Sequence, residues 1–392
     1  MMRTACLIRA MCPRATACPP APPRRAASLL GPGRATVARS RITRPWAPGG
    51  SRGVTAAVGT AEGASAKAGG QSHMSIDCPK HRYADDILRS RIELDCSAEA
   101  MPEPASLVEW GLRVLSAPDP RVKCALTHRA MAAWAAGGLP VGTANGAPLP
   151  DRPARPEHPK MVPFFEVPKQ PDSGMTNATY VLHQLAHVEL NAIDLAWDTV
   201  VRYAPLHKEG LLPAEFYEEF AWVADDESRH LGWALARMGE LEANYGDIPA
   251  HDNLWDCARV TFDDLEARLA VVPMVQEARG LDAGPRLAMR LVGWGDNRSA
   301  EVVRQISLEE IEHVAVGVRW FRHLCEGEGL DPGERFKDKV EEHCAFLMKG
   351  PYNHESRQLA GMEREWYEHI TAPPPPPGYK KGDFKNIARQ IK

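Results

Sequence analysis

Two short acidic stretches carry the residue types that bind metal ions. They read Asp-Asp-Glu-Ser-Arg-His and Glu-Glu-Ile-Glu-His, and each contains the pattern Glu-x-x-His, at Glu227/His230 and at Glu310/His313. Positions i and i+3 lie on one face of an α-helix, about one turn apart, so each pair presents a carboxylate and an imidazole to the same point. One such pair arises easily by chance. Two pairs on separate amphipathic helices indicate a shared metal site.

Two further glutamates complete the ligand set that such a site requires. Four-helix proteins that hold two irons combine two Glu-x-x-His pairs with one Glu from each of the other two helices. Glu189 falls within the apolar stripe of one predicted helix, and Glu277 directly follows the apolar residues of another. A carboxylate on a core-facing side is costly unless it is paired or binds a metal. We therefore expect a dimetal site made of Glu189, Glu227, His230, Glu277, Glu310 and His313.

Neighbouring polar residues could orient these ligands. Asp226 precedes one ligand pair and could hydrogen-bond an imidazole on a neighbouring helix. Asp194 and Glu309 are further candidates, as is Arg229, which could equally be a solvated charge. His187 is two residues from Glu189 and so nearly on the opposite face of the helix, where we expect it to hydrogen-bond outside the site.

The ligand set predicts the metal and the reaction class. Four carboxylates and two neutral imidazoles suit two iron ions, with a manganese–iron pair or two manganese ions as alternatives. Zinc fits less well, because it favours His and Cys in sites of lower coordination number. A metal-free bundle, in which the Glu and His side chains satisfy one another, would leave several carboxylates repelling each other.

Paired reduced irons react with O2, so we expect an oxidoreductase that hydroxylates or oxidises a small molecule, using an electron donor that the sequence does not identify. The alternative is an iron-binding or storage protein of ferritin type. Storage needs a shell-forming oligomer, whereas a monomer or dimer with an apolar pocket at the ligands favours the enzyme.

The fold expected is all-α, a ferritin-like four-helix bundle with extra N- and C-terminal helices. The apolar periodicity and the Pro and Gly positions place the four long helices. Pro273 should bend the third helix, and the interruption at 280–285 should lie within that helix rather than at its end. The predicted helices are Thr176 to Tyr203, Pro213 to Tyr245, Asp252 to beyond Val275, and Asp296 to Cys325.

Composition divides the chain into four parts. Residues 1–61 hold ten Arg, no Lys and no acidic residue, which is typical of an organelle transit peptide, for a chloroplast or alternatively a mitochondrion. A disordered basic arm that binds nucleic acid is the other interpretation. Residues 62–82 are expected to be a linker, 83–370 the ferritin-like domain with its core at about 176–326, and 371–392 a Pro-rich basic tail.

The charge of the remainder argues against a generic nucleic-acid binder. Removing the ten N-terminal positive charges from the formal net charge of −4 leaves about −14, and phosphate contacts need clustered Lys and Arg. The other six of the nine Cys include no Cys-x-x-Cys pattern, which suits a reducing compartment. No stretch approaches roughly 18 uninterrupted apolar residues, so we expect no membrane span.

A proline-rich segment, residues 139–175, is expected to cross the surface as a strap. Met161, Phe164 and Phe165 give it apolar side chains to bury. We expect this strap, together with residues 353–357, to cover a pocket beside the metals.

Several motifs of the chain also resemble those of a known family. They are His183-x-x-x-His187-Val-Glu189, Asp226-Glu-Ser-Arg-His230, Pro273-Met-Val-Gln-Glu277, Glu310-Ile-Glu-His313 and Asp151-Arg-Pro-Ala-Arg-Pro156. Over about residues 83–370 they resemble an uncharacterised ferritin-like "domain of unknown function" family, in which Asp is usual at the position of Glu309. The resemblance implies a ferritin-like fold and a dimetal site at the six residues given above. That family looks like a relative of the tRNA-modifying diiron monooxygenase, but a shared fold does not transfer a substrate.

Overall fold

The computed structural model describes residues 103–370, and within this range the chain is all-helical, without a strand. The one pairing of extended backbone there is an isolated bridge between Met161 and Ala250. The predicted all-α class is therefore confirmed. The predicted transit peptide, linker and tail lie outside the described residues, as do the first residues of the predicted domain.

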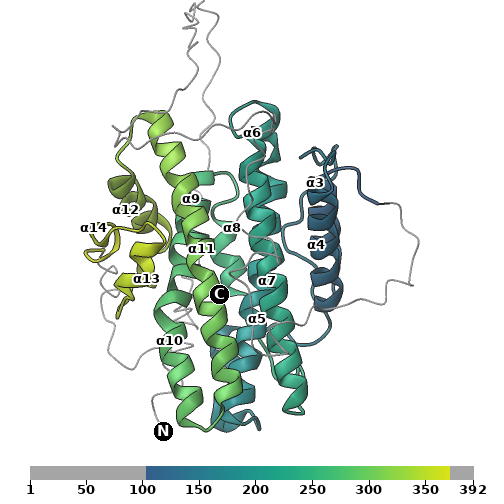
Figure 1. Ribbon diagram of the computed structural model, residues 1–392, viewed down its shortest axis with the longest axis vertical. Coiled ribbons are helices and arrows are strands. Elements are labelled where there is room, and N and C mark those ends of the chain that lie inside the picture. Colours follow the sequence, from purple (N-terminus) through teal and green to yellow (C-terminus); the bar gives the residue numbers. More distant parts are fainter. Residues whose placement is uncertain (1–102, 371–392) are drawn as a thin grey trace, which may run out of the picture. The chain divides into compact units, whose positions relative to one another are not determined.

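The first two long helices pack against each other along their length (Figure 1). Helix α5 (Asn177–Arg202) begins at Thr176, whose side chain accepts a hydrogen bond from the Thr179 amide, and the short helix α6 (Ala204–Lys208) follows it. Helix α7 (Ala214–Glu240) begins after Pro213. It ends five residues before the predicted Tyr245, because the chain turns at Glu242, which has a φ of 55°.

The third rod consists of four segments rather than one helix. Helices α8 (Asn253–Arg259) and α9 (Leu265–Val271) are separated by a break that the sequence analysis did not foresee, where Asp264 caps α9 through the Ala267 amide. The π-helical turn η4 (Val272–Glu277) follows and contains Pro273, so the predicted distortion is present. Helix α10 (Ala278–Gly293) then runs straight through the predicted interruption, with Pro285 inside it.

The fourth rod is helix α11 (Asn297–Glu328), which packs along α10 and also contacts η4, α9 and α7. The Asp296 side chain caps its start by accepting from the Ser299 amide at 2.9 Å. Gly329 ends it in the left-handed conformation, with a φ of 71°. The four rods thus surround a common interior (Figure 1).

Shorter helices flank these rods. Helices α3 (Leu107–Ser116) and α4 (Pro120–Ala135) pack against α5 and α7. On the other side, α12 (Pro332–His343) packs against α9 and α11, and α13 (His354–Leu359) packs against α11 and α10. The last helix, α14 (Arg364–Tyr367), packs against α12. In Figure 1 these two groups lie on opposite sides of the central rods.

The Pro-rich strap forms two 3₁₀ turns, η2 (Phe164–Glu166) and η3 (Gln170–Asp172). The Val162 amide donates to the Ala250 carbonyl at 2.8 Å, which ties the strap to the segment before α8. Its apolar side chains are buried only in part: Phe164 is partly buried, whereas Phe165 is 62% exposed and Met161 37% exposed. Backbone pairing, rather than an apolar face, therefore holds this part of the strap.

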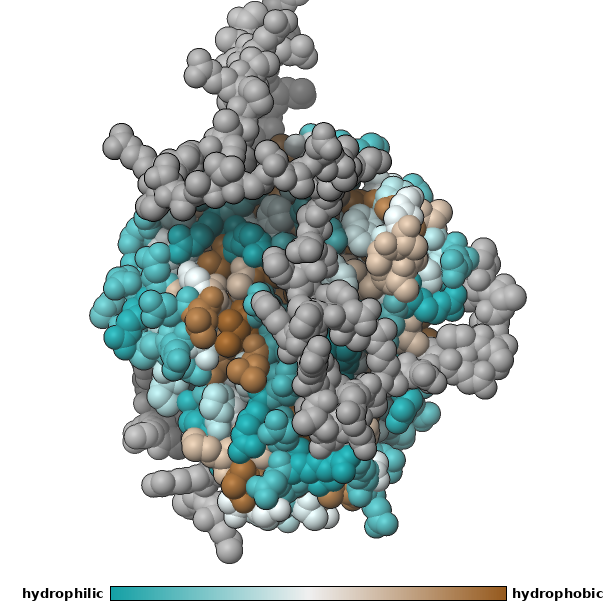
Figure 2. All heavy atoms as spheres, in the orientation of Figure 1, coloured by the Kyte–Doolittle hydropathy of each residue, from teal (hydrophilic) through white to brown (hydrophobic). Residues whose placement is uncertain are grey.

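Hydrophilic residues cover most of the described surface in the view of Figure 2, with apolar residues gathered in small patches. In the range 103–370, no helix is both long and apolar enough to cross a membrane. Four cysteines fall in this range, and all are buried: Cys124, Cys257, Cys325 and Cys344.

Candidate metal centre

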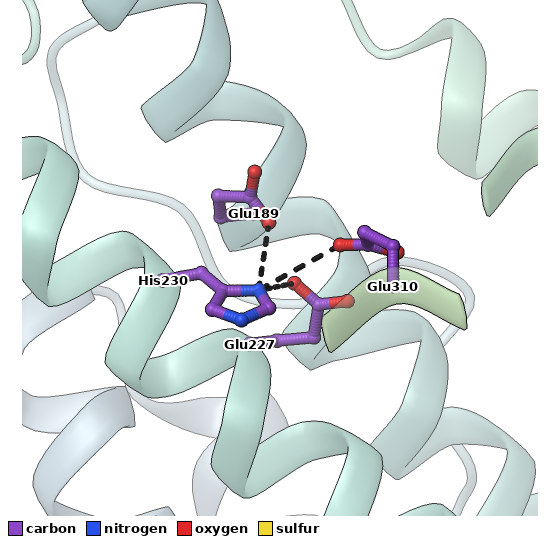
Figure 3. A group of neighbouring side chains, drawn as sticks. All are labelled: Glu189, Glu227, His230 and Glu310. Atoms are coloured by element: carbon purple, nitrogen blue, oxygen red, sulfur yellow. Dashed lines mark ion pairs between the residues drawn. The ribbon is translucent and has the colours of Figure 1, made fainter. Parts of the chain in front are cut away.

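Three glutamates and a histidine from α5, α7 and α11 converge in the interior (Figure 3). One ligand atom from each of Glu189, Glu227, His230 and Glu310 lies within 4.8 Å of the others. Nδ1 of His230 is 3.4 Å from Glu227 Oε2, 3.6 Å from Glu310 Oε1 and 3.8 Å from Glu189 Oε2. All four side chains are buried. This cluster could bind a metal ion.

His313 extends the cluster on the far side of two of these glutamates. Its Nδ1 lies 2.9 Å from Glu227 Oε1 and 3.5 Å from Glu310 Oε2. Glu227 and Glu310 therefore each direct one oxygen to His230 and the other to His313. The two imidazole rings are 5.6 Å apart between centroids. The two Glu-x-x-His patterns thus meet, because i, i+3 spacing puts each pair on one helix face.

Glu277 lies at the last position of the π-helical turn and borders the same cavity as the other three glutamates. It is half-buried, the most exposed of the four. Burial, followed by the negative charge of Glu310, raises the pKa of Glu277 to about 8. The structure thus brings all six predicted ligands to one region, with Glu277 at its open side.

The outer nitrogens of both histidines are held by acids of the opposite helix. His230 Nε2 lies 3.0 Å from Glu309 Oε2, and His313 Nε2 lies 3.4 Å from Asp226 Oδ2. Arg229 donates to Asp226 and also, at 2.8 Å, to Glu309. Because a carboxylate only accepts, each Nε2 carries a proton, and each Nδ1 faces the centre, where loss of its own proton would give a metal ion a lone pair.

Charges in the cluster strongly perturb its titration. Burial, reinforced by the Glu227 charge, raises the pKa of Glu189 well above its usual range. Glu227 shows the opposite direction: burial would raise its pKa, but the charge of His313 and the proximity of both imidazoles outweigh burial and lower it. Burial opposes protonation of His230 and His313, but the surrounding carboxylates raise both pKa values. Without a cation, protons must therefore balance these carboxylates.

Four unpaired polar atoms of the cluster indicate whether its residues fit a cation. Each is buried and makes no hydrogen bond within the described part of the chain: His230 Nδ1, His313 Nδ1, Glu227 Oε2 and Glu277 Oε2. Buried polar atoms are normally paired, so exceptions need an explanation. All four belong to the convergent residues and are nitrogen or oxygen donors that iron and manganese accept. The residues present therefore fit metal ions.

A cavity of about 120 Å³ adjoins the carboxylates. Its walls come from α5, from η4 and α10, and from the first half of α11, with aliphatic side chains such as Leu185, Val188 and Ile306. The predicted cover is wrong in both parts. Asn353 and Arg357 bond Asp282 on α10 instead. Among the strap residues none lines the cavity, although Phe164 contacts its lining residue His251 edge-on at 5.0 Å.

Two candidate residues lie away from the cluster. Asp194 accepts from Lys123 Nζ at 2.7 Å and from Arg155, so it serves a separate buried charge group. His187 bonds the Tyr245 hydroxyl and the His251 carbonyl, as expected for a residue outside the site. Gln184, Gln276 and Gly280 also line the cavity and were not predicted. No spacing or periodicity distinguished them from other helical positions.

Comparisons with known proteins place the chain in a family. An uncharacterized protein of Haemophilus influenzae is 33% identical over 221 residues, which cover 55% of this chain and 77% of that protein. The search of solved structures returned no match. A family model described as "Protein of unknown function (DUF455)" matches residues 116–368, a range that contains all six convergent residues. Since this range is more than half of the chain, the protein belongs to the DUF455 family.

Proposed function

We propose that the protein is a ferritin-like dimetal carboxylate oxidoreductase, in which the six convergent residues hold two iron ions and O2 oxidises a small molecule. Manganese in one or both positions is the alternative. One observation carries the proposal: four glutamates and two histidines from four helical rods meet in the interior, and four of their ligand atoms make no hydrogen bond within residues 103–370. Metal ions would neutralise the repulsion among these carboxylates.

The contacts suggest how two ions would be shared. Glu227 and Glu310 each direct one oxygen toward each imidazole, which suits bridging carboxylates. Glu189 approaches His230. Glu277 lies on the side of Glu310 and His313, which are close enough for their charges to affect its pKa. His230 with Glu189 and His313 with Glu277 would then hold one ion each, with Glu227 and Glu310 available to both; four-helix diiron proteins use the same residue types.

The residues around the site fit an oxidation reaction. Two reduced irons, when bound, would supply electrons for the reduction of O2, and an external donor would restore them. Asp226 and Glu309 fix the tautomer and direction of the two imidazoles. The aliphatic cavity would hold the substrate beside the carboxylates and exclude water. An apolar cavity at this position favours an enzyme over iron storage, because hydrated ions need a polar path.

Metal analysis combined with O2 uptake tests the proposal. The purified protein, reduced anaerobically and then mixed with O2, should contain about two irons per chain and consume oxygen. Glu227→Ala should lose both ions, because each would lose a shared ligand. The matched control is Glu240→Ala, which removes an exposed glutamate at the far end of α7. A Glu227→Ala protein that keeps both metals would contradict the site.

A further inference from the structure

The cavity, here called the slot, extends along the helices on both sides of the carboxylates, since Ala192 and Leu195 of α5 also line it. In the other direction it follows α5 from Glu189 back to Val181, and α10 from Glu277 on to Leu287. At about 1.5 Å per helical residue, these stretches correspond to roughly 12 Å and 15 Å. Helix α5 packs mainly with α7, and α10 packs mainly with α11. The slot lies between these two pairs, where α5 and α10 face each other. Its length suits an extended chain rather than a compact molecule.

The lining offers no partner for a charged ligand. Among the described residues that line the slot, none is lysine or arginine, and the acids are the four glutamates of the metal centre. Of the two lining histidines, His187 uses both ring nitrogens, on the Tyr245 hydroxyl and the His251 carbonyl, and burial lowers the pKa of His251 to about 4. A carboxylate or phosphate between Gln184 and Gln276, away from the metal centre, would be buried without a cationic side chain beside it, which is strongly unfavourable.

Two buried amides interrupt the apolar wall. Gln184 lies on α5 and Gln276 on the π-helical turn, and both line the slot while only 7% and 8% exposed. Gln276 donates its amide hydrogen to the Leu254 carbonyl at 3.4 Å, and its Oε1 has no partner within residues 103–370. Nε2 of Gln184 likewise has no partner in this range. The wall of the slot therefore contains one buried donor and one buried acceptor that are unpaired among the described residues, and a ligand group of opposite character would satisfy them.

We propose that the slot binds an elongated, uncharged, mainly aliphatic molecule that carries one group able both to donate and to accept a hydrogen bond, such as an amide. The polar group lies between Gln184 and Gln276, and the aliphatic chain extends toward Val181 and Leu287. The identification of this molecule as a substrate rests on the proposed oxidoreductase function, whereas its binding needs only the slot.

Gly280 provides a means of blocking the slot. It lies within α10 and lines the slot, and a Cβ added there would meet no atom within 4 Å. Gly284, one turn later, is unsuitable because an added Cβ would collide with the Ser307 hydroxyl. Gly280→Leu should therefore fill the slot without displacing α11. Gly293→Leu is the matched control: it lies at the end of the same helix, has open space and does not line the slot.

Calorimetric titration of the full-length protein without O2 tests the inference, with octanamide and octanoate as probes of equal length at pH 7.5. Octanamide should bind at least tenfold more tightly than octanoate. Gly280→Leu should weaken octanamide binding at least tenfold, and Gly293→Leu should leave it unchanged. In the double variant Gln184→Leu/Gln276→Leu, loss of two neutral hydrogen bonds should reduce the preference for octanamide by about tenfold.

Equal or tighter binding of octanoate by the wild-type protein would overturn the inference, as would wild-type octanamide affinity in Gly280→Leu. Metal content measured on the same samples separates the two proposals and reports whether each variant keeps its folded site. Octanamide binding without two metals would contradict the oxidoreductase alone. Two metals without a preference for octanamide would overturn the slot assignment alone.

Discussion

At the scale of single residues, Glu309 and Asp226 direct the two imidazoles without facing the centre of the cluster. Glu309 contacts His230 Nε2 at 3.0 Å and also accepts from Gln305 at 2.8 Å, so its carboxylate is held from two directions. Glu309→Ala should weaken metal binding by about 10–100-fold, because the His230 ring would lose the contact that fixes its orientation and basicity. Metal titration followed by dialysis and elemental analysis measures the effect.

Glu312→Ala is the control for Glu309, because Glu312 is an exposed glutamate one residue from His313. Its removal should leave metal affinity unchanged. If both variants bind metal as the wild-type protein does, the contact between Glu309 and His230 has no supporting role.

The same residues predict a dependence of metal loading on pH. In the metal-free protein the pKa values of Glu189, His230 and His313 are raised, and that of Glu277 is raised to about 8. Groups with raised pKa values hold protons that stabilise the folded state at low pH, and this stability is lost as pH rises toward about 8. Metal ions displace these protons, so their binding strengthens over the same range. The rise in thermal midpoint on adding Mn²⁺ should be larger at pH 8 than at pH 6.

Glu277→Gln supplies the comparison for this pH series, because the amide cannot titrate. Its Mn²⁺-induced shift should change less between pH 6 and pH 8 than that of the wild-type protein. A wild-type shift of equal size at both pH values would show that protons do not compete for the site.

Residue spacing predicted the convergence of the ligands but not all of their surroundings. The two Glu-x-x-His pairs fix their own geometry, because i, i+3 positions share a helix face. Asp194 was a candidate to orient a metal ligand, but spacing could not show that its partner is Lys123. Gln184 and Gln276 left no pattern, since a single amide on a helix is equally consistent with a solvent-facing position.

At the scale of elements, the π-helical turn depends on a glycine of the neighbouring helix. A Cβ added at Gly317 would lie 2.5 Å from Pro273 Cβ, so α11 can approach η4 only because this position has no side chain. Gly317→Ala should displace η4 and with it Glu277, which lowers both the thermal midpoint and the metal content. Thermal unfolding and elemental analysis of the same sample measure both.

The control is Gly327→Ala. Gly327 lies on the same helix, and a Cβ added there meets no described atom within 4 Å. Because alanine favours helix over glycine by up to about 1 kcal/mol, this control should be neutral or stabilising. Should Gly317→Ala behave in the same way, the close approach to Pro273 has no structural importance.

Helix starts were predicted more accurately than helix ends and internal breaks. Thr176, Pro213 and Asp296 mark starts through capping chemistry or proline, and all three stand where the structure begins a helix. The break between α8 and α9 was missed because its residues continue the apolar pattern. At Pro285 the opposite happened: an interruption was predicted, but helix α10 continues through this residue. Local propensity is a weak guide where the surrounding structure favours a helix.

At the scale of the whole molecule, a buried charge group connects the flanking helices to the central rods. Lys123 of α4 and Arg155 of the strap both bind Asp194 of α5, and Lys123 also donates to the Val114 carbonyl of α3 at 2.9 Å. Lys123→Met should lower the free energy of unfolding by about 3 kcal/mol, at the lower end for a broken buried pair, because Arg155 still neutralises Asp194. Denaturant titration measures the change.

Arg304→Ala is the corresponding surface change, because it removes an exposed ion pair with Glu301 on α11. It should alter the free energy of unfolding by no more than about 0.5 kcal/mol. Equal losses in Lys123→Met and Arg304→Ala would mean that the buried group does not join the flanking helices to α5.

Contacts between segments distant in the sequence were the least predictable feature. The strap was expected to bury Phe165 and cover the pocket, but the backbone bridge at Ala250 holds it elsewhere. The slot itself arises from the spacing between α5 and α10, which no local pattern encodes.

The reciprocal arrangement of Asp226 and Glu309 restricts how α7 and α11 can move. Each helix carries a histidine together with the acid that aims the histidine of the other helix. A slip of one helix past the other by a single turn, about 5.4 Å, would misdirect both rings at once. The two ions would consequently be released together rather than one at a time, so a stable half-loaded protein should not accumulate.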